Sequence, residues 1–140
     1  MTQQILVCNN EPHVVRAISL KFMRAGFDVK AVSDADSCGR YLNSHDAPAV
    51  LIVDVSMPRG MELVQTLRSA DRLSGLPVIA LTENIFETIE QSELLLSLDI
   101  DQIFPKPFSP REVLSATHRL LGHEVDQYDL HCGREYATCH

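Results

Sequence analysis

The chain has 140 residues, 45% of them hydrophobic, and its 12 basic and 19 acidic residues give a formal net charge of −7. This is the length of one domain, and the hydrophobic fraction is enough for a core without metals or disulfides. The acidic balance and the lack of a Lys/Arg run argue against direct nucleic-acid binding. No apolar run approaches the ~20 residues of a membrane helix, and no positive region precedes the first apolar segment. We therefore expect a cytoplasmic protein.

Apolar runs alternate with amphipathic segments along the chain, which is typical of α/β proteins. Strands are expected at residues 5–8, 27–32, 49–54, 76–82 and 99–104. Helices are expected at residues 12–25, 33–43, 59–73, 84–97 and 109–121. Five strands alternating with five helices predict a doubly wound parallel sheet with helices on both faces.

Residues with specific end preferences mark several helix boundaries. Asn10 is expected to cap the first helix, which has Pro12 in its first turn and Gly26 after its last. Ser33-Asp34-Ala35-Asp36 opens the second helix in the manner of a capping box, with Asp36 in place of the usual Glu. Ser109, followed by a proline and then a glutamate three residues on, predicts the start of the last helix.

Polar residues follow four of the expected strands: Asn9 and Asn10, Asp54, Thr82, and Lys106. Taken singly, Asp54 is a common strand terminator, Thr82 a common helix cap and Lys106 a solvated surface charge. The carboxyl ends of parallel strands meet at one edge of a sheet, where open α/β sheets build their sites. Together these residues predict a functional site.

These residues resemble the receiver domain of two-component response regulators. Three motifs carry the resemblance, in the expected order: Asp54-x-x-Met57-Pro58, the run 77–82 that ends at Thr82, and Lys106-Pro107-Phe108. The resemblance implies a (βα)5 flavodoxin-like fold for residues 1–121, with residues 122–140 as an extension outside it. It also implies a role in two-component (phosphorelay) signal transduction and not an enzymatic one.

The resemblance assigns roles to the predicted site residues. Asp54 is at the position of the phosphoacceptor, a nucleophile that takes a phosphoryl group from a histidine kinase or phosphotransfer protein. Thr82 and Lys106 are at positions that contact phosphoryl oxygens. The Lys106–Pro107 peptide bond is expected to be cis, an isomer that proline makes accessible. A downstream protein is the implied target.

The resemblance also implies a magnesium ion, with ligand positions at Asn9, Asn10, Asp54 and the backbone carbonyl of Ser56. The family normally has two acidic residues where this chain has Asn9 and Asn10. Magnesium strongly favours carboxylate over neutral oxygen, so we expect weak or absent binding. Glu11 is the nearest substitute, or else it starts the first helix.

Three further departures affect the loops around Asp54. The segment Arg59-Gly60 arrives about two residues early, which shortens the loop after Pro58. Ile103 stands where the family has a switch aromatic, and Glu83 stands where it favours a small residue.

We expect Lys106 to pair directly with Asp54 and hold one conformation. Such a domain would be an interaction module that docks through its first helix or its helix 4–strand 5–helix 5 face, the latter also a possible homodimer interface.

Other readings remain open from the sequence. A conventional phosphoacceptor that tolerates the Asn pair is the nearest alternative. An aspartate-nucleophile phosphatase of the haloacid dehalogenase kind would need a second Asp at the position of Ser56. A flavodoxin-like cofactor carrier would need a phosphate loop after the first strand.

The extension, residues 122–140, is expected to pack on the domain or reach a partner. A zinc site from His131-Cys132 and Cys139-His140 is disfavoured by their spacing.

Overall fold

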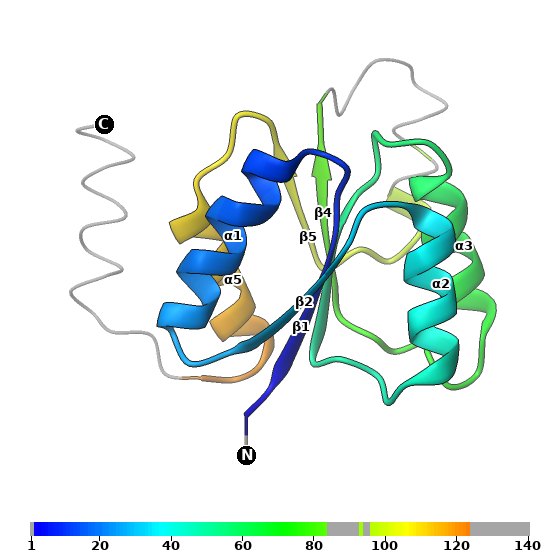
Figure 1. Ribbon diagram of the computed structural model, residues 1–140. Helices are drawn as coiled ribbons and strands as arrows, with labels where there is room; N and C mark the ends of the chain where they lie inside the picture. The colour runs from blue at the N-terminus through cyan, green and yellow to red at the C-terminus, as the bar shows by residue number, and fades with distance from the viewer. Residues whose placement is uncertain (1, 84–92, 94–95, 124–140) are drawn as a thin grey trace.

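A five-stranded parallel sheet forms the centre of the computed structural model, which describes residues 2–83, 93 and 96–123 (Figure 1). The strands are β1 (Gln4–Cys8), β2 (Asp28–Val32), β3 (Val50–Asp54), β4 (Val78–Thr82) and β5 (Gln102–Pro105). The described helices are α1 (Pro12–Arg24), α2 (Ala35–Ser44), α3 (Gly60–Ser69) and α5 (Pro110–Leu120). The strand order is β2-β1-β3-β4-β5, which is the order of flavodoxin-like sheets. The predicted fold class is confirmed.

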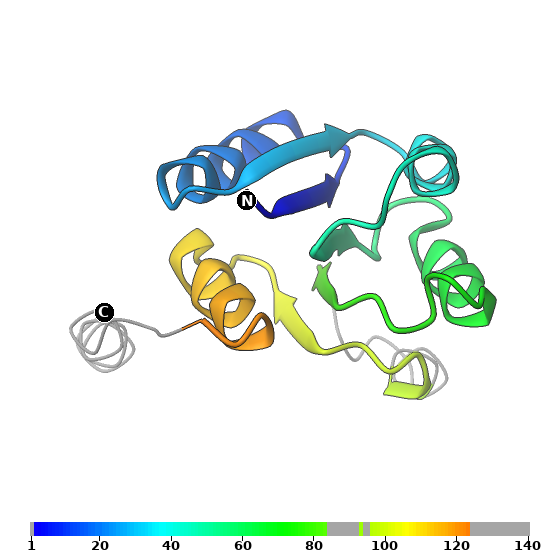
Figure 2. The same cartoon turned by 90° about the horizontal axis from the view of Figure 1, so that it is seen from below.

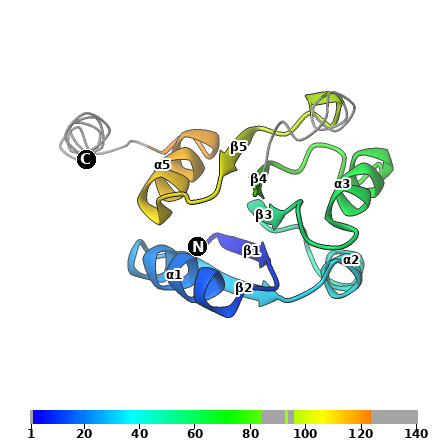
Figure 3. The same cartoon turned by 90° about the horizontal axis from the view of Figure 1, so that it is seen from above.

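Helices cover both faces of the sheet. Helices α1 and α5 lie side by side on one face, and α2 and α3 lie on the other (Figures 2 and 3). The two faces form separate apolar clusters, because successive side chains of a strand point to opposite sides. All five residues of β3 and of β4 are buried, as expected for inner strands of a parallel sheet covered on both faces.

The predicted cap of α5 is confirmed, because Ser109 accepts a hydrogen bond from the backbone N–H of Glu112. At α2 the cap is Asp34, one residue after the serine that opens the predicted capping box, and it accepts a 2.7 Å hydrogen bond from the backbone N–H of Ser37. Gly26 follows α1 with φ of +95°, a conformation that glycine adopts at little cost. The prediction that Asn10 caps α1 was wrong. The cap position is Glu11, and no side chain caps the first turn of α1; the backbone N–H of Glu11 donates to Asn9 Oδ1 at 2.7 Å.

Two element boundaries were also predicted wrongly. Strand β5 begins at Gln102 and not at Asp99, because the preceding turn is pinned outside the sheet. Asp99 has φ of +55°, and Arg68 donates hydrogen bonds of 2.9 Å to the carbonyls of both Leu98 and Asp99. Helix α3 ends at Ser69, short of the predicted 73.

Some predictions fall outside the described residues. The predicted helix at 84–97 lies mostly there, and so does most of the extension at 122–140, including the disfavoured zinc pair. The described part of the extension consists of Gly122 and His123. In the part of the chain that the structure describes, no helix has the length and apolar character needed to cross a membrane.

Candidate functional site

The four predicted strand-end positions meet at the carboxyl edge of the sheet. Asn9 follows β1, Asp54 ends β3, Thr82 ends β4 and Lys106 follows β5. Strand β1 pairs with both β2 and β3, so the chain reverses its direction of winding between β1 and β3. Sites in open α/β sheets form at this switch point. The sheet topology therefore places Asp54 where a site is expected.

Asp54 is 2% exposed, and both of its carboxylate oxygens have partners. Oδ1 accepts a 2.8 Å hydrogen bond from the backbone N–H of Ser56. Oδ2 accepts from Lys106 Nζ at 2.7 Å and from Asn9 Nδ2 at 3.5 Å. A buried carboxylate is costly unless it is paired and hydrogen-bonded, and these three donors meet that need.

Lys106 is surrounded by three carboxylates. Its ammonium group contacts Glu11 and Asp54, and Glu83 Oε1 lies 3.8 Å away. Burial by itself lowers the pKa of Lys106, but the hydrogen bonds to Asp54 and Glu11 outweigh it and the net shift is upward. The hydrogen bond from Lys106 in turn lowers the pKa of Glu11. The ammonium is thus held charged, and the expected pairing of Lys106 with Asp54 is present.

The peptide bond that precedes Pro107 has the expected isomer. The Lys106–Pro107 bond is cis in the structure.

Thr82 contacts Ser56 and makes no hydrogen bond to Asp54 within the described residues. Its hydroxyl lies 3.2 Å from Ser56 Oγ, which also accepts a 2.8 Å hydrogen bond from the backbone N–H of Glu83. The family resemblance implied a role for the Ser56 carbonyl alone, and the contacts of the Ser56 side chain were not predicted. The available signal was the Ser56 hydroxyl, two residues beyond the strand-ending Asp54. The loop after β3 turns this hydroxyl toward Thr82 at the end of β4.

The residues at the predicted magnesium positions are a poor match for a hard divalent ion. Both polar ends of the Asn9 amide are used, because Oδ1 accepts from Glu11 and Nδ2 donates to Asp54. Asn10 is exposed. Within residues 2–83, 93 and 96–123, no group of three or more His, Cys, Asp or Glu side chains is placed to hold a metal. In this conformation Asp54 offers the one carboxylate of the predicted set, and the Lys106 ammonium already contacts it.

The loop after β3 passes close to the backbone of Asp54. A Cβ atom at Gly60 would lie 2.6 Å from the carbonyl oxygen of Asp54, so this approach requires glycine. Arg59 has φ of +64° and pairs with Asp36 at 2.9 Å. The early Arg59-Gly60 segment therefore brings the start of α3 against β3 and turns the arginine toward α2.

The departure at Ile103 also has a structural counterpart. Ile103 is half-buried and packs against the apolar cluster under α2 and α3, whereas Phe104 packs on the α1 and α5 side. No aromatic ring occupies position 103, so the described site lacks the ring that the resemblance associates with switching.

Comparisons with known proteins agree with this geometry. The family model of the response regulator receiver domain matches residues 5–118. The chain is 28% identical over 123 residues to the alkaline phosphatase synthesis transcriptional regulatory protein PhoP of Bacillus subtilis. It is 32% identical over 121 residues to the transcriptional regulatory protein GltR of Pseudomonas aeruginosa. These alignments cover 86% and 85% of this chain but 49% of each relative, so the chain spans about half their length.

Solved structures share the fold. The chemotaxis response regulator CheY4 of Vibrio cholerae has a TM-score of 0.76 and 21% identity, over 86% of this chain and 99% of that one. The receiver domain of sensor histidine kinase PA1611 from Pseudomonas aeruginosa PAO1 has a TM-score of 0.76 and 22% identity, over 87% and 99%. That structure has a magnesium ion coordinated in its active site cleft. The family match spans all four strand-end positions, and the chain belongs to the response regulator receiver domain family.

Proposed function

We propose that this chain is an atypical receiver module of two-component signal transduction, in which Lys106 holds Asp54 in one conformation. The observation that carries the proposal is the 2.7 Å contact between Lys106 Nζ and Asp54 Oδ2, at a carboxylate that is almost fully buried. In this proposal the module is cytoplasmic, works by protein interaction and has no enzymatic activity of its own. Phosphorylation of Asp54 is then slow or absent.

The charge balance supports weak magnesium binding. Replacing two acidic residues by Asn9 and Asn10 removes two negative charges from the metal position. One charge at ~4 Å is worth about 4 kcal/mol at an effective dielectric near 20, before desolvation is subtracted. The Lys106 ammonium also competes with a cation for the same Asp54 oxygen. Both effects disfavour the ion on which phosphoryl transfer in this family relies.

The proposed partners are a histidine kinase or phosphotransfer protein and a downstream protein target. Family membership supports this class of partner. The relatives PhoP and GltR are named transcriptional regulatory proteins, and this chain covers about half of each. The predicted docking surfaces are α1 and the helix 4–β5–α5 face, the latter also as a homodimer interface, although the predicted helix 4 lies mostly outside the described residues.

Amide NMR spectra of the full chain test the proposal. Magnesium is added first, and beryllofluoride, a mimic of the aspartyl-phosphate, is then added with it. We expect no saturating shift of the Asp54, Thr82 or Lys106 signals in either step. Shifts that saturate at ordinary magnesium concentrations, respond to beryllofluoride and vanish in Asp54→Ala would instead establish a conventional phosphoacceptor.

A charge-restoring variant provides the matched control. Asn9→Asp/Asn10→Asp returns the two carboxylates that magnesium prefers, so this variant is expected to show saturating shifts at the same edge of the sheet. A gain of binding in the variant attributes weak binding in the parent chain to the missing charges. Equal binding by both proteins would remove the charge argument.

A further inference from the structure

An exposed stripe of α1 combines apolar and basic side chains. The stripe consists of Arg16, Leu20, Met23 and Arg24, which lie three or four residues apart and therefore on one side of the helix. Leu20 is 45% and Met23 is 51% exposed. They are two of the three large hydrophobic side chains that are exposed within the described residues, the third being Leu96. Among the residues that the structure describes, this α1 stripe therefore holds two of the three large exposed hydrophobic side chains.

The charge of α1 is entirely of one sign. Residues 12–24 contain no Asp or Glu, and their basic residues include Arg16, Lys21 and Arg24. None of these three makes an ion pair with another residue of the described ranges 2–83, 93 and 96–123. In a chain of net charge −7, a helix that contains basic but no acidic residues is a local exception that favours an acidic partner.

The sequence beyond the described residues has the complementary character. Residues 124–140 contain four acidic residues, Glu124, Asp126, Asp129 and Glu135, and one basic residue, Arg134. The same segment carries apolar side chains among the acidic ones, including Val125, Tyr128 and Leu130. An acidic segment with interspersed apolar residues matches the basic and apolar α1 stripe in both respects.

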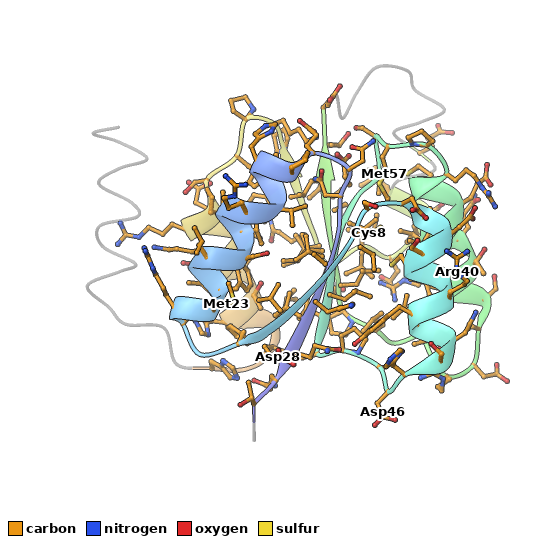
Figure 4. The ribbon with its side chains drawn as sticks, viewed as in Figure 1. Cys8, Met23, Asp28, Arg40, Asp46 and Met57 are labelled. Carbon is orange, nitrogen blue, oxygen red and sulfur yellow. The ribbon has the colours of Figure 1, made fainter. Side chains whose placement is uncertain are left out.

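The chain reaches the end of the described region beside α1. The backbone N–H of His123 donates to the His118 carbonyl at 2.9 Å, and the two imidazoles approach with their Nδ1 atoms 2.9 Å apart. The His123 ring is stacked against Phe27, with 6.1 Å between centroids. Phe27 directly follows the glycine that ends α1. The last described residue is thus held at the same end of α1 as Met23, which Figure 4 labels.

The distances allow the segment to cover the stripe. From Arg16 to Arg24 a helix rises about 12 Å, at 1.5 Å per residue. A 17-residue segment reaches about 25 Å as a helix and more when extended, so its length is sufficient in either of these conformations. Tethering also raises its effective concentration at the stripe to the millimolar range, so that even a weak contact is populated.

Three observations support one proposal: the opposite charges of the two segments, the position of His123 beside the end of α1, and the length of the chain after it. We propose that residues 124–140 fold back onto the α1 stripe of the same chain and cover it. The acidic side chains pair with Arg16 and Arg24, and the apolar ones cover Leu20 and Met23. The segment is then an intramolecular mask, and a partner that uses this face of α1 must displace it.

Paramagnetic relaxation in the full chain tests this proposal. Cys8 and Cys38 are fully buried, so a thiol-reactive spin label on the Cys139→Ser variant is directed to Cys132. The protein is also isotope-labelled, and its amide signals are compared between samples in which the spin label is oxidised and samples in which it is reduced. We expect strong loss of signal at Arg16, Leu20 and Met23 in the oxidised sample, and none at Arg40 on α2, across the sheet from Met23 (Figure 4).

Charge variants separate docking from mere proximity to the exit point. Arg16→Glu/Arg24→Glu should restore the signals of Leu20 and Met23. Salt at 0.5 M should restore them in part, because the Debye length falls below its value of about 10 Å at 0.1 M and the charge pairs are screened more strongly. Arg40→Glu, on the exposed side of α2, is the matched control and should leave the signal loss unchanged. Persistence of the loss in the double variant would overturn the proposed charge pairing.

Two other results would overturn the proposal outright. One is a loss of signal confined to the C-terminal end of α5 or to the region of Leu96, with the α1 stripe unaffected. The other is a loss at the stripe when spin-labelled protein without isotope is mixed with isotope-labelled protein without a spin label. That result would mean that the segment docks on a second copy.

Discussion

Lys106 Nζ lies 2.7 Å from Asp54 Oδ2, and this pair joins the end of β5 to the end of β3 across the strand between them. The two side chains differ in exposure, at 15% for Lys106 and 3% for Asp54. Lys106 has a second close carboxylate partner in Glu11, whereas Asp54 has no other cation within the described residues. The pair is therefore asymmetric, and its two halves are expected to respond differently to mutation.

Lys106→Met is expected to destabilise the fold more than Asp54→Asn. The first variant leaves a buried carboxylate with no counter-charge, a change that costs about 3–5 kcal/mol. The second leaves Lys106 with Glu11 as its partner. Urea unfolding of both variants and of the double variant measures the difference, and the double variant should lose less than the sum of the single ones. Additive losses would contradict a direct interaction between the two residues.

Glu11→Gln is expected to lower stability at neutral pH and to have a smaller effect in acid. The hydrogen bond from Lys106 lowers the pKa of Glu11 below its usual 4.5. A carboxylate with a lowered pKa contributes stability above its unfolded-state pKa and loses it as the pH falls through the folded-state value. The urea midpoints of parent and variant should therefore differ by a constant amount above about pH 4.5 and approach each other as the pH falls below it. A difference that does not shrink as the pH falls would count against the charge interaction.

Two glycines provide a matched pair of alanine substitutions in helices α3 and α2. Gly60→Ala places a Cβ 2.6 Å from the Asp54 carbonyl oxygen, and this backbone clash should cost about 1–3 kcal/mol despite the better helix propensity of alanine. At Gly39 the new Cβ would meet Leu63 at 3.9 Å, an ordinary contact. Gly39→Ala should therefore stabilise the protein by about 0.5–1 kcal/mol. Thermal or urea unfolding distinguishes the two signs.

Cys8 and Cys38 are expected to be inert in the folded protein. Both thiols are fully buried, and a hydrogen bond with Cys38 together with burial raises the pKa of Cys8, which keeps the thiol protonated. In a Cys132→Ser/Cys139→Ser variant, a chromogenic disulfide reagent should therefore react with no thiol under native conditions and with both in denaturant. Reaction at native pH would mean that β1 or α2 opens readily.

The sequence predicted the positions of the site residues well, because local patterns fix strand ends. The apolar run that stops at Asp54 and the proline-flanked Lys106 both mark a strand-to-loop boundary, and a parallel sheet brings such boundaries to one edge. The cap at Ser109 was equally predictable, since a cap depends on residues within one turn. The start of β5 was not, because Arg68, about thirty residues earlier, pins the turn before it.

The sequence by itself therefore determined the sheet and the residues at its edge, since these follow from periodicity and strand ends. The tertiary structure alone decided which partner each side chain takes. Glu11 pairs with Lys106, 95 residues away, and the Asn9 amide turns toward both Asp54 and the start of α1. Such choices depend on how buried polar groups are satisfied across several strands at once, and no local pattern encodes that balance.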